Sequence, residues 1–233
     1  MYAQEDNQHP GHEHCDDPVA SWAAGELLFR EINGRQRIAL LVPPAVAATM
    51  IPVFRLLSGA FENAVIGWYL GLVCYWLTWC TILPLRLVGK QRLKQIFRPQ
   101  KPNITVVLLV LFPAAMAAVA KMLTGMGYQK PELWVWLLYI STAFGNGFFE
   151  ELLWRGLYME LFPDRILYRI IWPSIGFALW HYAPGSVSAN SNPLALIIGA
   201  GLFGFLLAFL AKKTDRIWWG VVAHVVGGIV MVI

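Results

Sequence analysis

Seven apolar segments, each about 20 residues long, constrain the fold of this chain more than any other feature of the sequence. A helix rises about 1.5 Å per residue, so such a segment crosses the roughly 30 Å hydrocarbon core of a bilayer. The segments lie at about 38–57, 64–85, 104–123, 133–162, 166–183, 194–211 and 217–233. The first is the weakest, because it contains three prolines and one arginine: Pro43, Pro44, Pro52 and Arg55. We predict about seven spans, within a range of six to eight.

The composition excludes a soluble globular protein. Hydrophobic residues make up 58% of the chain and charged residues only 14%, against roughly 45–50% and 25% in soluble domains. So few charges cannot cover a surface that faces water. The 11 Trp and 8 Tyr suit the two bilayer interfaces. The fold class is therefore an all-α, polytopic transmembrane helical bundle, with the lipid bilayer as its surroundings.

The basic residues predict the orientation of this bundle. They gather near 30–37, 86–101, 165–169 and 212–216, which lie on one side of the membrane if seven spans alternate. The positive-inside rule then places the N-terminus in the cytoplasm and the C-terminus outside, in a plasma (inner) membrane. The net charge of +4 reflects these loops, so we expect no nucleic-acid partner. A polar cytoplasmic tail covers 1–36 and the transmembrane bundle covers 37–233.

The polar tail contains a cluster of potential metal ligands: His9, His12, His14, Cys15, Asp16 and Asp17. The cluster is open to two interpretations, a metal site or a polar tail with incidental metal affinity. We favour the polar tail, because the composition is that of a segment without a packed core.

A tight set of charged or ionisable residues lies on three of the apolar segments: Glu150, Glu151, Arg155, His181 and His224. Such groups are expensive at membrane depth, so each is a functional candidate. Glu151 and Arg155 are four residues apart and share a helix face, which predicts an ion pair. Four residues after Glu150 stands Trp154, so Glu150 has no cation at the spacing that would pair it within its helix. We therefore expect its carboxyl group to face the bundle interior. An apolar environment there suits a carboxyl group to acid/base work.

Counting along the helices places three of these side chains at a similar depth. From the cytoplasmic ends, Glu150, His181 and His224 lie at about 18, 22 and 11 Å, within the uncertainty of helix tilt. A lone histidine is more often a packing residue, and the Glu-Glu-x-x-x-Arg pattern can be a purely structural ion pair. Two histidines and an excess carboxylate on separate helices favour a shared site instead.

Two hydrolytic chemistries fit this set of side chains. A glutamate and two histidines can hold zinc and a water, although the His-Glu-x-x-His spacing that supports such a site is absent. Alternatively, no metal and no other cofactor is required. Glu150 then takes a proton from a water that His181 orients, and His224 donates to the developing oxyanion.

At these residues the chain resembles the CPBP family (CAAX proteases and bacteriocin-processing enzymes, also called Abi). The first family motif appears as Glu150-Glu151 followed by Arg155, the second as Phe177 followed by His181, and the third in part as His224. The resemblance covers a protease core at about 133–233. It implies an intramembrane glutamic endopeptidase, similar to type II CAAX prenyl proteases. In such an enzyme Glu150 and His181 activate the water, and His224 helps to form the oxyanion hole.

One residue departs from the family pattern. Gly228 stands four residues after His224, where the family has Asn or Asp as a second oxyanion donor. Three explanations are open, in order of preference. Asn146, four residues before Glu150, substitutes as an oxyanion helper; a water fills the space; or catalysis is weak. Asn146 also lies between two glycines, so its other interpretation is a helix kink.

The function expected from these residues is hydrolysis of a peptide bond in a membrane-anchored or membrane-inserted peptide or protein. Glu151 and Arg155 are expected to orient their helix as a structural pair. Three rivals remain, in this order: a non-catalytic binding or immunity protein of the same fold, a zinc-dependent membrane protease, and a transporter. The sequence shows no repeat symmetry that would favour the transporter.

Overall fold

The computed structural model describes residues 32–124, 132–188 and 192–232. The chain divides into the units Met1–Gly34 and Arg35–Ile233, and the helices described below form the second unit. Residues 1–31 of the predicted polar tail, with its histidine cluster, lie outside the described residues, and its last three residues, 34–36, already belong to the first helix of the bundle.

Every regular element among the described residues is helical, so the all-α prediction is confirmed. The elements before the first undescribed internal stretch are α2 (Gly34–Ala60), α3 (Ala64–Tyr75), η1 (Trp76–Ile82), α4 (Leu83–Leu87), α5 (Lys90–Ile96) and α6 (Ile104–Thr124). Those after it are α7 (Leu133–Gly145), η2 (Asn146–Glu150), η3 (Leu152–Leu157), α8 (Tyr158–Leu161), η4 (Leu167–Ile171), α9 (Trp172–Trp180), α10 (Tyr182–Gly185), α11 (Pro193–Thr214) and α12 (Trp218–Val232). The η elements are π-helical turns.

Each predicted apolar segment is a helix or an almost unbroken helical run. The segment at 133–162, for example, corresponds to α7, η2, η3 and α8, which follow one another with helical backbone angles at their junctions. Three runs are long and apolar enough to cross a membrane: Gly34–Ala60, Ala64–Leu87 and Pro193–Thr214. Two shorter apolar helices lie at Ile104–Val119 and Trp218–Met231. The bundle is that of a helical membrane protein, and the count of seven spans stays a prediction.

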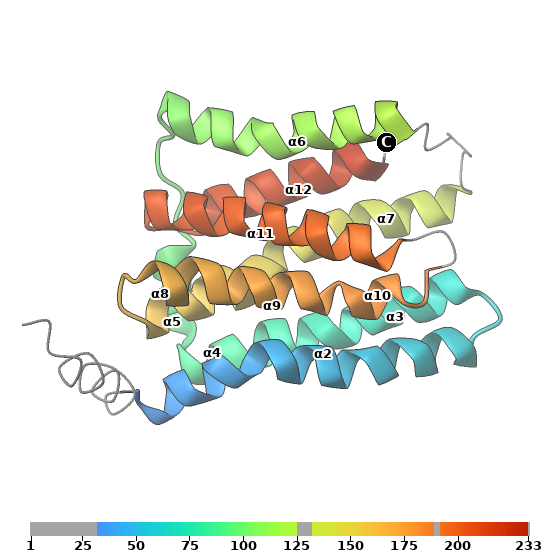
Figure 1. Cartoon of the computed structure of the whole chain (residues 1–233), viewed down its shortest axis with the longest axis horizontal. Coiled ribbons are helices and arrows are strands. Elements are labelled where there is room, and N and C mark those ends of the chain that lie inside the picture. The colour runs from blue at the N-terminus through green and yellow to red at the C-terminus, as the bar shows by residue number, and fades with distance from the viewer. Residues whose placement is uncertain (1–31, 125–131, 189–191, 233) are drawn as a thin grey trace, which may run out of the picture. The chain divides into compact units, whose positions relative to one another are not determined.

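Helix α12 is central to the packing of the C-terminal part. It contacts α6, α7, η2 and α11, and α11 in turn packs along α9 (Figure 1). The outward faces carry exposed aliphatic side chains, among them Leu41, Leu56, Ile104, Leu137 and Leu202. Large apolar side chains on the outside of the bundle are expected where the surrounding solvent is lipid.

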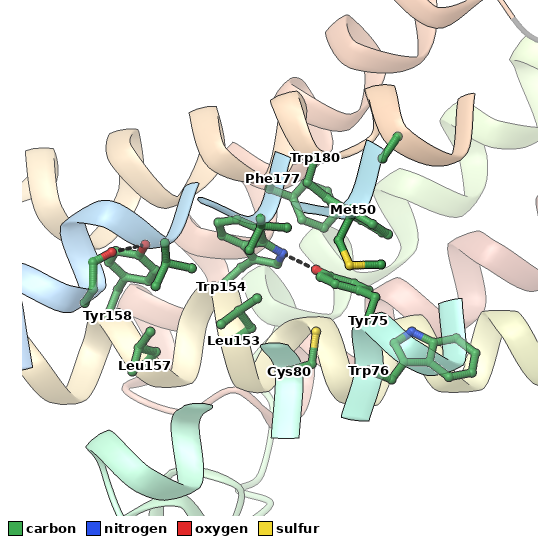
Figure 2. Close-up of a cluster of buried hydrophobic side chains, with 14 of the residues drawn as sticks. Met50, Tyr75, Trp76, Cys80, Leu153, Trp154, Leu157, Tyr158, Phe177 and Trp180 are labelled. Carbon is green, nitrogen blue, oxygen red and sulfur yellow. Dashed lines mark hydrogen bonds between the residues drawn. The ribbon is translucent and has the colours of Figure 1, made fainter. Parts of the chain in front are cut away.

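An aromatic core joins the N-terminal helices to the second half of the bundle. Its largest buried side chains include Tyr75 of α3, Trp154 of η3, and Phe177 and Trp180 of α9 (Figure 2). Aromatic rings bury large areas and align in preferred pair geometries, so they hold neighbouring helices at defined distances. Several of these rings border the polar site described next.

Candidate active site

The two glutamates lie where the long helical run changes from α-helical to π-helical winding. Glu150 ends η2, and Glu151 stands between η2 and η3. Both side chains are 0% exposed. π-helical turns occur mostly in short stretches and frequently at functional sites, because the wider turn changes which side chains share a face.

This wider turn affects the interpretation of Asn146. The four-residue spacing from Glu150 was read as α-helical, but Asn146 begins η2. Its side-chain oxygen accepts a hydrogen bond from Trp76 Nε1 at 3.0 Å. The assumption of α-helical spacing is therefore wrong here, and the structure places Asn146 against η1. A role for its amide nitrogen at the oxyanion stays a prediction.

The two oxygens of Glu150 have different surroundings. Trp180 Nε1 donates a hydrogen bond to Oε1 at 2.8 Å. Oε2 lies 3.5 Å from His224 Nε2 and has no hydrogen-bond partner among the described residues. A buried polar atom without a partner is unusual in native structures and calls for an explanation. One oxygen of the carboxyl group is thus anchored, and the other is left available beside a histidine.

Glu151 is the centre of a second set of contacts. Arg155 Nη1 donates to its Oε1 at 3.0 Å, so the predicted ion pair is present. The Nδ1 atom of His224 lies 3.0 Å from the same oxygen. The sequence-based interpretation assigned Glu151 only to the arginine pair, and the contact with His224 was missed because it joins two different helices.

Arg155 is buried to 1% exposure and is held from several sides. Besides Glu151, it donates from Nη2 to the backbone oxygen of Gly204 at 2.9 Å. Its guanidinium carbon lies 4.6 Å from the centre of the Phe177 ring. A buried cation requires this degree of compensation, because its desolvation costs on the order of several kcal/mol.

His224 is the residue that connects the two glutamates. It comes from α12, is 6% exposed, and reaches Glu150 with one ring nitrogen and Glu151 with the other. The sequence predicts no local cation for Glu150, but Arg155 of the same helical run lies near enough to interact with it electrostatically. The ionisable group that contacts Glu150 directly is His224, which α12 supplies by packing on η2.

His181 lies next to this cluster and is only partly buried. Its Nδ1 atom is 2.6 Å from the backbone oxygen of Phe177, and its ring lies against the Phe177 ring, 4.5 Å between centres. It is near enough to His224 for the two imidazoles to interact electrostatically. No hydrogen bond joins it to Glu150 among the described residues. The structure therefore brings four of the five predicted residues into direct contact and leaves His181 at the edge.

Gly220 allows α12 to approach Glu151. A Cβ atom at this position would lie 2.8 Å from Glu151 Oε2, closer than real Cβ contacts. The carboxylate cannot easily move away, because its other oxygen is bound by Arg155 and His224.

We expect Gly220→Ala to lower the free energy of unfolding by about 1–3 kcal/mol, the usual cost of overpacking. The matched control is Gly199→Ala on α11, where a Cβ would contact nothing and helix propensity favours alanine. Thermal unfolding in detergent measures both. Equal stability of the two variants would contradict the close approach of α12 to Glu151.

Gly228 is tightly packed. A Cβ atom there would lie 3.0 Å from the Cβ of Ala143 on α7. Helix α7 thus occupies the space into which a side chain at position 228 would point. This packing argues against the explanation that a water replaces the missing side chain there.

The donor set was also compared with what a metal site requires. Within 32–124, 132–188 and 192–232, no group of three or more His, Cys, Asp and Glu side chains is arranged to hold a metal ion. Structural and catalytic zinc sites use three or four such ligands around one point.

The fold and the buried cluster define a helical membrane protein with a carboxylate–histidine site. Residues 132–230 match the family model described as type II CAAX prenyl endopeptidase Rce1-like. This segment of the chain is therefore similar to the CAAX protease (CPBP) family, the same family that the motifs resemble. This similarity suggests a membrane endopeptidase. No match was found among the curated proteins or the solved structures that were compared with the chain.

Proposed function

We propose that this protein is an intramembrane endopeptidase of the glutamic type, in which Glu150 activates the attacking water. The observation that carries the proposal is the Oε2 atom of Glu150, which is fully buried, has no hydrogen-bond partner in the part of the chain that the structure describes, and faces His224 at 3.5 Å. A general base must present a free oxygen within hydrogen-bonding distance of the proton it takes. The family match at 132–230 supports the same activity.

The first chemical step uses Glu150 and His224 together. Glu150 Oε2 removes a proton from water while the water oxygen attacks the carbonyl carbon of the substrate. His224, as the imidazolium ion, donates a hydrogen bond from Nε2 to the carbonyl oxygen, which becomes an oxyanion. The carboxylic acid of Glu150 then gives its proton to the amide nitrogen, the C–N bond breaks, and the carboxylate is regenerated.

Glu151 orients His224 for this role. Its contact with Nδ1 at 3.0 Å leaves Nε2 directed at Glu150. A carboxylate that holds one ring nitrogen fixes the orientation of the imidazole and stabilises its charged form. Arg155 keeps Glu151 in place, so the pair acts on the site through His224 as well as on the helix.

His181 acts at the edge of the site. When its Nδ1–H donates to the backbone oxygen of Phe177, its Nε2 has a free lone pair that accepts a hydrogen bond from the attacking water. In this proposal it orients the water without touching Glu150.

The substrate is a peptide or protein that reaches the bilayer. We propose that all seven helical runs span the membrane, with the N-terminus in the cytoplasm and the C-terminus outside. The family description names prenyl endopeptidases, so a prenylated C-terminal CAAX peptide is the first candidate. Bacteriocin-like peptides, signalling peptides and C-terminal sorting tails are the other classes that the family resemblance allows.

The proposal is tested by cleavage in liposomes. The full chain is incubated with a prenylated CAAX peptide, the same peptide without its prenyl group, and membrane-anchored peptides of the other classes. We expect cleavage that is unchanged by a strong chelator. Loss of activity with chelator, and its return with zinc, would favour the zinc-dependent protease instead.

A second candidate function is a non-catalytic membrane protein that binds a peptide, for instance in immunity to a peptide toxin. It is favoured by Gly228, which supplies no side chain and packs directly against α7. The discriminating observation is the effect of Glu150→Gln on the cellular function. A binding protein keeps its function when this carboxylate is lost, whereas a peptidase does not.

Restoring the family's second oxyanion donor requires room at Ala143. We expect Gly228→Asn alone to reduce stability, because its Cβ meets Ala143 at 3.0 Å. Combined with Ala143→Gly, it should recover stability and raise turnover, by up to about 10²-fold if the missing donor limits the rate. Cleavage rates and thermal unfolding of the single and double variants measure this. Unchanged turnover in a stable double variant would show that another group already serves the oxyanion.

A further inference from the structure

Tyr75 lies outside all three sequence motifs and outside the matched segment 132–230, yet it borders Glu150. It is the last residue of α3 and is fully buried. Its ring stacks on Trp180 with 3.7 Å between ring centres and 17° between planes. Trp180 is the residue whose Nε1 donates to Glu150 Oε1 at 2.8 Å. The stack therefore holds the indole ring that anchors the carboxyl group.

The hydroxyl group of Tyr75 is also directed. Trp154 Nε1 donates to it at 2.7 Å, as the dashed line in Figure 2 shows. An indole N–H only donates, so the single proton of the hydroxyl points away from Trp154. The carboxyl group of Glu150 and the thiol of Cys80 lie beside this hydroxyl. A carboxylate is a stronger acceptor than a thiol, so Glu150 is the favoured acceptor for this proton.

We propose that Tyr75 is a positioning residue for Glu150. Its ring, stacked on Trp180, and its hydroxyl, oriented by Trp154, hold the carboxyl group so that Oε2 is presented to His224. The N-terminal helices thus contribute to the site that the C-terminal family segment carries. The consequence for turnover rests on the proposed peptidase function, but the position of the carboxyl group does not.

The chain offers a matched pair of variants, Tyr75→Phe and Tyr158→Phe. Both tyrosines are 0% exposed, and each loses one hydroxyl when replaced. The Tyr158 hydroxyl donates to the backbone oxygen of Ala39 at 2.8 Å, the second dashed line in Figure 2. Tyr158→Phe therefore removes a buried hydrogen bond without touching the site, and Tyr75→Phe keeps the ring that stacks on Trp180.

In the liposome assay we expect Tyr75→Phe to lower kcat by about tenfold to a hundredfold, the range for a lost hydrogen bond to a charged group. KM should stay at the wild-type value, because the substrate does not touch Tyr75. Tyr158→Phe should leave both kcat and KM unchanged. A wild-type kcat for Tyr75→Phe would overturn the proposal, as would an equal loss in Tyr158→Phe.

A spectroscopic measurement tests whether Tyr75 positions the Glu150 carboxyl group, and it does not require that the protein cleaves a substrate. The infrared band of the Glu150 carboxyl group is isolated in each protein by subtracting the spectrum of the same protein carrying Glu150→Gln. We expect the band to shift in Tyr75→Phe and to keep its position in Tyr158→Phe. An unshifted band in Tyr75→Phe overturns the proposal. If the wild type cleaves no peptide, the proposed function fails, and this comparison still decides whether Tyr75 holds Glu150.

Discussion

Replacing Glu150 by Gln is expected to lower kcat by about 10²–10⁴-fold, the range attributed to a positioned general base. The amide group has nearly the same shape as the carboxyl group, and its oxygen still accepts the hydrogen bond from Trp180 that is 2.8 Å long in the wild type. It cannot take a proton from water. The rate of peptide cleavage in liposomes measures the loss, and thermal unfolding in detergent checks that the variant folds.

The matched control for this variant is Glu160→Gln on α8. Glu160 belongs to the same helical run, but its carboxylate faces Arg92 at 3.5 Å and contacts no residue of the site. We expect wild-type turnover from this control. A Glu150→Gln protein that folds normally and still cleaves at the wild-type rate would remove Glu150 from the mechanism.

The largest expected effect on stability comes from Arg155→Met. The Glu151–Arg155 pair is 3.0 Å long and almost completely buried, so removing the arginine leaves the Glu151 carboxylate inside the bundle with only the His224 contact of the two. Removing one partner of a buried ion pair lowers the free energy of unfolding by about 3–5 kcal/mol. Methionine keeps most of the side-chain volume of arginine. The decrease in the free energy of unfolding is therefore caused by the lost charge and not by a cavity. Unfolding in detergent or mixed micelles measures the difference in free energy.

Two further variants test the cause of this loss. Adding Glu151→Gln to Arg155→Met removes the negative charge of Glu151, which has lost its arginine partner, and should restore part of the stability. Arg92→Met breaks the pair with Glu160, in which the arginine side chain is 68% exposed, and should cost no more than about 1 kcal/mol. Equal losses from Arg92→Met and Arg155→Met would contradict the assignment of a buried ion pair.

Much of the fold could be predicted from local sequence patterns. Runs of apolar residues of membrane-spanning length mark helices, because a helix is the structure that satisfies every backbone polar group in lipid. The helical segments agree with those runs. The Glu151–Arg155 pair also follows from local spacing, since residues four apart in one helix face each other.

The spacing argument failed where the local winding changed. Asn146 was placed on the face of Glu150 by counting 3.6 residues per turn, but residues 146–150 wind as a π-helix. The amino-acid sequence around Gly145 and Gly147 does not distinguish a π-helical turn from a helix kink. Its occurrence depends on how η1, η2 and α12 pack against one another, which is a property of the folded bundle.

By itself, the sequence determined that this protein is a bundle of apolar helices, with charged side chains inside the apolar segments and with motifs similar to those of the CAAX protease family. Those properties are local: they depend on residues within a few turns of each other. Only the tertiary structure decided that His224 lies between Glu150 and Glu151, that Tyr75 stacks on the Trp180 ring that donates to Glu150, and that Gly228 packs against Ala143. Each of these contacts joins helices far apart in the chain, and the approach of two helices is set by the summed packing of all their side chains.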